Sequence, residues 1–415
     1  MPEPTLPRLQ RIGATIFLCL LPCSLANAAR PTSSQPASPA IKLKVRPDDG
    51  PTREGFERFY NSDYEGAIQN FEKTLKAHPD DAFAMNHVLE AVLFREIDRE
   101  GSLNGELYLG TEFLHSKRAA VDADARARIQ ELTKQSLSVS EERLKAKPDD
   151  VDALYARGIT RSLSAIYEGL VEKAWYTAFR DALGAYDDHK RVLELVPSYN
   201  DAKLVVGVYV YVASALPIYE RVVAFMFNIR GGKAEGIASV REAANAGGEA
   251  SVDAKTALSL FLAREHEYSE AIALVRELYA AYPHNFHYGL SEADVLRNSG
   301  KIPEAVASYR DLLALGQRNE FAGQHIERAA IGLGRALHLQ GDVRGAANAF
   351  DSAGQMAGAT HEMATRANLQ AGEMYDLLHD RVAAKKRYEA VLAAGDDSMD
   401  AREAKRFLKD PYRDP

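Results

Sequence analysis

The chain has 415 residues, of which 46% are hydrophobic and 27% are charged, a balance typical of a soluble globular protein. Its net charge of -8 argues against nucleic acid as a partner, because phosphates are neutralised by clustered Lys and Arg. The length allows two or three ordinary domains or one elongated array of repeats.

Residues 1–28 have the pattern of an export signal. Arg8 and Arg11 precede an apolar core, Ile12 to Leu21, and Ala26-Asn27-Ala28 fits a small-residue cleavage site. The apolar core is too short for a membrane span, which needs roughly 20 residues. We therefore expect export to the periplasm or cell envelope after cleavage near Ala28.

Both cysteines, Cys19 and Cys23, lie inside this signal. The mature chain would then have no disulfide, no thiolate nucleophile and no cysteine metal site. Lipidation of Cys23 is the alternative, although Leu20-Leu21-Pro22 lacks the small residue that lipoprotein signals favour before the cysteine.

Residues 29–52 are rich in Pro, Ser, Thr and Ala and show no helical period, so they are expected to form a disordered linker. A docking motif is the alternative for this stretch. From there the helical period hardly stops, and residues 53–160 are expected to form N-terminal repeats.

Residues 161–235 form a degenerate apolar segment. Trp175, Phe179, Leu183 and Tyr186 lie on one face of a long helix and are expected to pack in the core. Leu204 to Ile218 is the most apolar stretch of the mature chain, and we expect a buried central helix there. A helix on the membrane surface or against a partner is the alternative.

Clear repeats return over residues 236–395, and residues 396–415 are expected to form a capping helix and a tail. Along the chain a small residue, a large apolar residue four later and a late Pro recur with a period near 34. The positions that carry this pattern are Ala67, Phe71, Pro79, Pro148, Gly158, Ala271, Pro283, Ala305, Tyr309, Gly334, Ala346, Phe350, Gly372, Tyr375, Ala384 and Tyr388. Small residues let two helices approach to about 8–10 Å, and Pro fixes the turn between repeats.

Over roughly residues 53–410 this pattern resembles the tetratricopeptide repeat family, and more narrowly an exported bacterial member of it. The resemblance implies an all-α fold, a right-handed superhelical solenoid of helix-turn-helix repeats. It also implies that the first helix of each repeat, helix A, lines a groove that holds another protein or peptide. By repeat register the polar residues expected to line that groove are His287, Asp294, Arg297, Asn298, Arg328, Arg335, His338 and Arg366. Leu290, Ile331 and Leu369 stand where a carboxylate clamp would need polar groups.

Sequence motifs for catalysis are missing: there is no His-Glu-x-x-His and no Gly-x-Ser-x-Gly. We therefore expect no enzyme activity, no cofactor and no metal site, and interpret the acidic pairs Asp80-Asp81, Asp149-Asp150 and Asp187-Asp188 as exposed caps or turns. The predicted function is an exported protein-binding scaffold. The alternative is an envelope assembly factor that contacts the membrane through residues 204–218.

Overall fold

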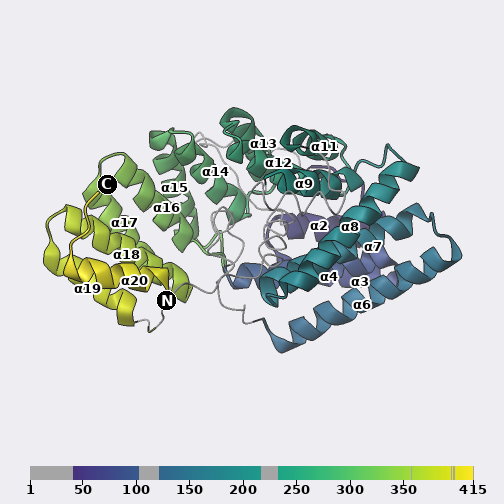
Figure 1. Ribbon diagram of the computed structural model, residues 1–415, viewed down its shortest axis with the longest axis horizontal. Helices are drawn as coiled ribbons and strands as arrows, with labels where there is room; N and C mark the ends of the chain where they lie inside the picture. The colour runs from purple at the N-terminus through teal and green to yellow at the C-terminus, as the bar shows by residue number, and fades with distance from the viewer. Residues whose placement is uncertain are drawn as a thin grey trace. The chain divides into compact units, whose positions relative to one another are not determined.

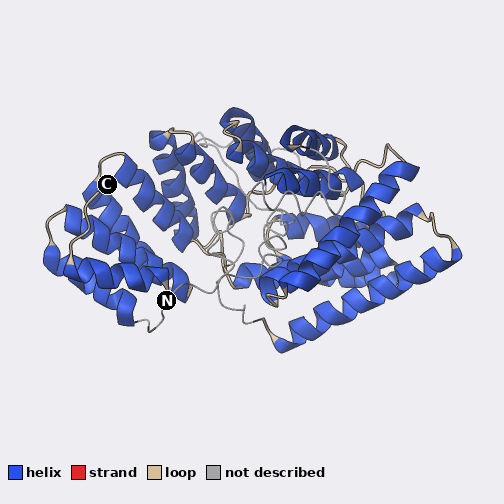
Figure 2. Ribbon diagram, viewed as in Figure 1, coloured by secondary structure: helices blue, strands red, loops and turns tan. Residues whose placement is uncertain are grey.

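The structure, a computed structural model, describes residues 41–101, 121–215, 232–356, 358–393, 395 and 398–414. The expected signal, residues 29–40 of the expected linker and residues 216–218 of the apolar stretch lie outside these residues. Every regular element within the described ranges is a helix, as Figure 2 shows. The all-α fold class is therefore confirmed. In the same ranges a single parallel bridge, between Lys44 and Gly248, lies outside the helices.

The chain divides into two compact units, each described by itself. In the described ranges the N-terminal unit runs to Glu267 and includes residues 280–282. It contains α2 (Gly50–Tyr60), α3 (Tyr64–Ala77), α4 (Ala82–Arg99), α6 (Ala123–Ala146), α7 (Val151–Ile166), a π-helical turn (Tyr167–Val171), α8 (Trp175–Leu195), α9 (Ala202–Ala215), α11 (Lys233–Asn245) and α12 (Ser251–Arg264). Consecutive helices pack on one another, α2 on α3 and α7 on α8 among them (Figure 1).

The C-terminal unit takes residues 268–279 and 283–414 of the described chain. It contains most of α13 (Tyr268–Ala281), then α14 (Phe286–Asn298), α15 (Ile302–Gln317), α16 (Glu327–Leu339), α17 (Val343–Gln355), α18 (His361–Leu377), α19 (Arg381–Ala393) and α20 (Met399–Lys409). Neighbours in the chain are again neighbours in space, from α14 on α15 to α19 on α20. These are the helix pairs that the repeat pattern predicts.

Aspartate side chains cap the N-termini of several of these helices. Asp81 and Asp150, the second acids of two Pro-Asp-Asp turns, accept hydrogen bonds from the backbone N–H groups of Phe83 and Ala153 and so cap α4 and α7. Such caps satisfy donors that the first helical turn leaves free. The interpretation of these two acids as caps is confirmed.

Asp188 behaves differently from the other acids. It lies inside α8, is buried, and pairs with Arg157 at 2.6 Å and with Arg161 at 2.8 Å. The expectation of an exposed cap or turn is wrong for this residue. Two cations from α7 neutralise its charge, which makes burial tolerable.

Glycine against an aromatic ring is the repeated contact within the helix pairs. A Cβ added to Gly334 would lie 2.6 Å from the ring of Phe350, and one added to Gly372 would lie 2.4 Å from that of Tyr388. Each pair is 16 residues apart in the sequence. The small residue on the first helix therefore makes room for the ring of the second.

The apolar stretch lies in α9, which packs against α11. A Cβ added to Gly207 would lie 2.8 Å from the carbonyl oxygen of Gly236, so the two backbones are in direct contact. The side chains from Val208 to Ala213 are buried. The described part of the stretch is thus the buried helix that we expected. Among the described residues no helix is both long and apolar enough to cross a membrane.

Two boundaries differ from those expected from the sequence. The expected linker ends earlier, because α2 begins at Gly50 and Val45 is already buried. The helices α11 and α12, which the sequence groups with the C-terminal repeats, belong to the N-terminal unit. Contact with α9 places α11 there.

Candidate functional site

Residues 41–49 lie against the N-terminal unit as a segment without helix. The Lys44 backbone N–H donates to the Gly247 carbonyl at 3.2 Å, and the Arg46 backbone N–H donates to the Glu249 carboxylate at 2.8 Å. Val45 between them is buried. The helical unit thus holds an extended piece of chain by its backbone, as a protein that binds peptides does.

The side chain of Arg46 fills an aromatic cage. Its guanidinium carbon lies 4.5 Å from the ring centroid of Phe83, 5.0 Å from that of Tyr155 and 5.1 Å from that of Tyr199. Those rings come from α4, from α7 and from the turn before α9. A cation over the faces of aromatic rings is attracted by their quadrupoles, by about 0.5–2 kcal/mol for each contact.

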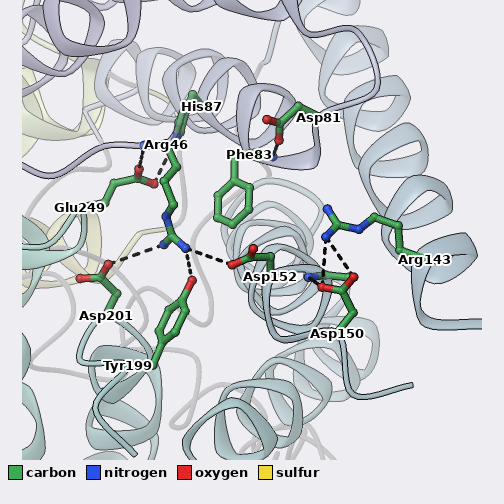
Figure 3. Close-up of polar contacts among 11 residues, drawn as sticks. Arg46, Asp81, Phe83, His87, Arg143, Asp150, Asp152, Tyr199, Asp201 and Glu249 are labelled. Atoms are coloured by element: carbon green, nitrogen blue, oxygen red, sulfur yellow. Dashed lines mark hydrogen bonds and ion pairs between the residues drawn. The ribbon is translucent and has the colours of Figure 1, made fainter. Parts of the chain in front are cut away.

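Acidic groups complete the cage. Figure 3 shows the Arg46 guanidinium directed at the Tyr199 hydroxyl, with Asp152 at 3.5 Å and Asp201 at 3.6 Å. Burial disfavours the charge of Arg46, but the attraction of Tyr199, Tyr155 and Glu249 outweighs it and raises the pKa of Arg46 above its ordinary value. Burial also raises the pKa of Asp201, and Arg46 opposes that rise. The cage is therefore built for a cation.

Glu249 joins the cage to a second feature. One of its carboxylate oxygens accepts from the Arg46 backbone and the other lies 3.0 Å from His87 Nε2 (Figure 3). The His87 ring packs edge-on against Phe56 and at a tilt against Phe71, and it is 3% exposed. Beyond this ring lies a pocket.

The pocket has a volume of about 100 Å³ and lies entirely within the N-terminal unit. Most of its lining is apolar and comes from α2, α4, α7, α9 and α12: Phe56, Phe83, Phe94, Tyr155, Ile159, Leu163, Ile166, Leu204, Val205, Val208, Ala250 and Ala257. Its polar lining is Asn86, His87, Glu90, Ser162, Glu249 and Asp253. An apolar pocket with a few convergent polar groups is the usual form of a binding site.

Two of its carboxyl groups titrate abnormally. Burial, reinforced by Asp253 and Glu249, raises the pKa of Glu90 well above its usual range. Burial also raises the pKa of Asp253, to about 7, against the hydrogen bond that it accepts from the Tyr60 hydroxyl at 2.9 Å. Raised carboxyl pKa values in a pocket mark functional sites more often than chance.

Within 41–101, 121–215 and the later described ranges, no group of three or more His, Cys, Asp or Glu is placed to hold a metal ion. The carboxylates of the pocket converge without a metal-binding geometry.

The residues expected to line the groove of the C-terminal repeats lie in three environments. His287, Asp294, Arg297 and Arg328 are buried, Arg335, His338 and Arg366 are partly exposed, and Asn298 is exposed. Several make intrachain contacts: Arg297 lies 3.6 Å from Asp294, His338 lies 3.2 Å from Asp414, and Arg366 lies 3.3 Å from Asp400. Contacts within the chain therefore occupy much of the helix face that the repeat register predicts to be free for a partner. A binding role for these eight residues stays a prediction.

Sequence reasoning missed the cage and the pocket altogether. Arg46 lies in a stretch that reads as linker, while Glu249 and Asp253 lie about 160 residues from His87 and Glu90. One signal was present: Glu90 interrupts the apolar run Val88-Leu89-Glu90-Ala91-Val92 inside a helix whose face is buried. A charged residue at such a position needs a partner or a function.

Residues 290–358 match the model of a family described as tetratricopeptide repeat. No curated protein matches the chain. Among solved structures, a human IFIT1 dimer with m7Gppp-AAAA is 10% identical, with a TM-score of 0.45, over 98% of this chain and 86% of that one. PilF of Pseudomonas aeruginosa is 17% identical, with a TM-score of 0.39, over 63% of this chain and 99% of that one. Yeast Tom70 is 15% identical, with a TM-score of 0.35, over 87% and 88% of the two chains.

Likenesses of this size support no statement about activity or partner. The family match is supported by this chain's own helices, because the glycine-to-ring contact of α16 and α17 within it recurs in α18 and α19 beyond it. Residues 290–358 of this chain thus carry tetratricopeptide repeats.

Proposed function

We propose that this chain is an exported, non-catalytic scaffold that holds a partner protein or peptide on its repeats. The observation that carries the proposal is the seating of residues 41–49. The N-terminal unit binds this extended segment through backbone hydrogen bonds and one caged cationic side chain. A surface that accepts a peptide from its own chain has the features needed to accept one from another chain.

The C-terminal repeats have exposed and partly exposed polar side chains of their own for a partner. Asn298 at the end of α14 is exposed, and Arg335 and His338 on α16 are partly exposed. All three lie on first helices within residues 290–358, which match the tetratricopeptide repeat family, and in that family the first helices line the groove. Polar groups at such positions give an interface its register and specificity.

Export is the part of the proposal that rests on sequence alone. Arg8, Arg11, the apolar core from Ile12 to Leu21 and Ala26-Asn27-Ala28 follow the order of a cleaved signal. We propose the periplasm or cell envelope as the place where the scaffold works.

Site-specific photo-crosslinking in the producing cell tests this function. A photoreactive phenylalanine replaces Asn298 on a first helix, and in a matched control it replaces Val382, which is 84% exposed on the second helix α19. We expect one partner protein to be cross-linked from position 298 and not from position 382. Equal labelling of many proteins from both positions, by a folded chain, would contradict the proposal.

A further inference from the structure

Three carboxyl groups line the pocket of the N-terminal unit, and no cation is among the described residues that line it with them. Glu90 comes from α4, Glu249 from the turn before α12, and Asp253 from α12. Paired or neutralised acids are the rule in protein interiors, so these carboxyl groups have no Lys or Arg partner in the described part of the lining.

Glu90 is the group that lacks a partner most plainly. Both oxygens of Glu249 are engaged, by the Arg46 backbone and by His87, and Asp253 accepts from Tyr60. Glu90 has no hydrogen bond or ion pair with any described residue, and the charged groups that act on it are the acids Asp253 and Glu249. Glu90 is half-buried, and a carboxyl group there that accepts no hydrogen bond from the protein can accept one from a bound donor.

His87 supplies an independent sign of a missing donor. It is 3% exposed and lines the pocket, and its Nδ1 has no hydrogen-bond partner. In the neutral tautomer whose proton is on Nε2, facing the Glu249 carboxylate, Nδ1 is an acceptor. His87 and Glu90, on adjacent turns of α4, therefore both present an acceptor at the pocket.

The adjoining cage shows which kind of donor this wall accepts. Phe83 and Tyr155 border both the pocket and the cage, and Glu249 serves both as well. In the cage the same two rings hold the guanidinium of Arg46. The pocket is lined by the same two rings and by carboxylates, and no cation is among its described lining residues.

We propose that the pocket binds a primary ammonium or guanidinium group at the end of a short alkyl chain, the chemistry of a Lys or Arg side chain. The apolar residues, Phe94, Leu163 and Val208 among them, surround the alkyl chain. Glu90 and Asp253 receive the charged end. A volume of about 100 Å³ suits such a group, since it is smaller than the 150 Å³ that accommodates benzene.

Proton balance follows from this chemistry. Burial and the neighbouring acids Asp253 and Glu249 disfavour the charged form of Glu90 and raise its pKa. An ammonium ion that enters makes the carboxylate the favoured form, and the released proton goes to solvent. The titratable groups that face Glu90 are Glu249 and Asp253 near α12, His87 on its own helix and Tyr155 on α7, while the lining from α9 is apolar.

The proposal deepens the scaffold function, since it names the side chain that a partner would present, and it rests on that function for the source of the cation. Titration calorimetry on the purified chain with n-butylammonium chloride tests it at pH 8, with n-butanol as the neutral probe of similar shape. We expect saturable one-to-one binding of the ammonium and at least about tenfold weaker binding of the alcohol.

Glu90→Gln should weaken ammonium binding by about tenfold or more, since it removes a charge-assisted hydrogen bond. Glu141→Gln is the matched control, because Glu141 is an exposed acid on α6 outside the pocket. Asp253→Asn, which keeps the acceptor for Tyr60, is the second variant, and circular dichroism establishes that each variant is folded. Absent ammonium binding, equal binding of n-butanol, or wild-type affinity in a folded Glu90→Gln variant would overturn the proposal.

A third probe, lysine capped as N-acetyl-lysine N-methylamide, identifies the source of the cation. Binding at least as tight as that of n-butylammonium supports a side chain from a bound partner, and exclusion of the capped lysine supports a small free amine. The amine titrations need no partner protein. Their failure would reject the pocket and leave the scaffold function standing, whereas failed cross-linking would reject the scaffold function alone.

Discussion

The guanidinium carbon of Arg46 lies 4.5 Å from the ring centroid of Phe83, in a stack that joins the chain before the first helix to α4. The same guanidinium faces Asp201 and Asp152. Arg46 lies in a Pro-rich stretch whose composition predicts disorder. Its side chain nevertheless packs in the N-terminal unit as a bound ligand would.

Removal of that side chain should destabilise the N-terminal unit. We expect Arg46→Ala to lower the free energy of unfolding by about 1–3 kcal/mol, because it removes ring contacts and leaves Asp201 buried without its cation. Arg46→Lys should recover part of this loss, since the charge remains and the planar stack does not. Arg53→Ala, which removes an exposed ion pair with Asp48, is the control. Urea unfolding followed by circular dichroism measures all three, and equal stability of Arg46→Ala and wild type would contradict the cage.

The glycine-to-ring contact predicts a clash in the C-terminal unit. Gly334→Ala places a Cβ 2.6 Å from the Phe350 ring and should cost about 1–3 kcal/mol, more than the helix propensity gained from alanine. Phe350→Leu in the same chain should relieve part of that cost. Gly50→Ala, where no atom lies within 4 Å, should be neutral or stabilising. Thermal melting measures the series, and an unchanged melting curve for Gly334→Ala would show that the two helices do not meet there.

The pocket acids predict that stability falls as pH rises. The pKa of Asp253 is raised from 3.8 to about 7, so the folded chain binds protons that the unfolded chain releases. The stability that this proton binding contributes is fully present below about pH 4 and is lost as pH passes 7, by at most about 4 kcal/mol. Asp253→Asn should flatten the dependence between pH 5 and pH 8.5. Urea unfolding across this range measures it; stability that rises steadily toward pH 8.5 in the wild type would rule the raised pKa out.

Export predicts a shortened chain in the cell. N-terminal sequencing of the protein purified from the producing cell should begin at Ala29, because Ala26-Asn27-Ala28 is the cleavage pattern. Replacing Ala28 with a bulky residue should slow this processing. Recovery of the intact Met1 end from the cytosolic fraction would exclude export by this signal.

The helices were predictable because their signals are local. The 16-residue spacing of Gly334 from Phe350 and of Gly372 from Tyr388 places a small residue opposite a ring in any helix pair with a short turn, so the sequence determines the contact. The burial of Asp188 was not predictable in this way, because its partners lie on another helix, about 30 residues earlier.

The candidate site could not be predicted from the sequence, because the contacts that form it join residues far apart in the chain. Glu90 and Asp253 are ordinary single acids in sequence, and only the packing of α4 and α12 in one unit brings them to the same pocket. The repeat register also did not predict which side chains are exposed. It places Arg297 on the helix face expected to be free for a partner, yet this side chain is buried beside Asp294. Replacement of Arg297 would test folding and binding together, so Asn298 is the better position for a probe.

Direct titration of the purified chain with the purified cross-linked partner tests the central claim, that the repeats hold another protein. The account predicts saturable one-to-one binding that Glu90→Gln weakens by about tenfold and Glu141→Gln leaves unchanged. If neither Glu90→Gln nor Glu141→Gln weakens binding of the partner, the interface lies outside the pocket. No saturable binding of any cross-linked protein to the folded wild-type chain would contradict the account.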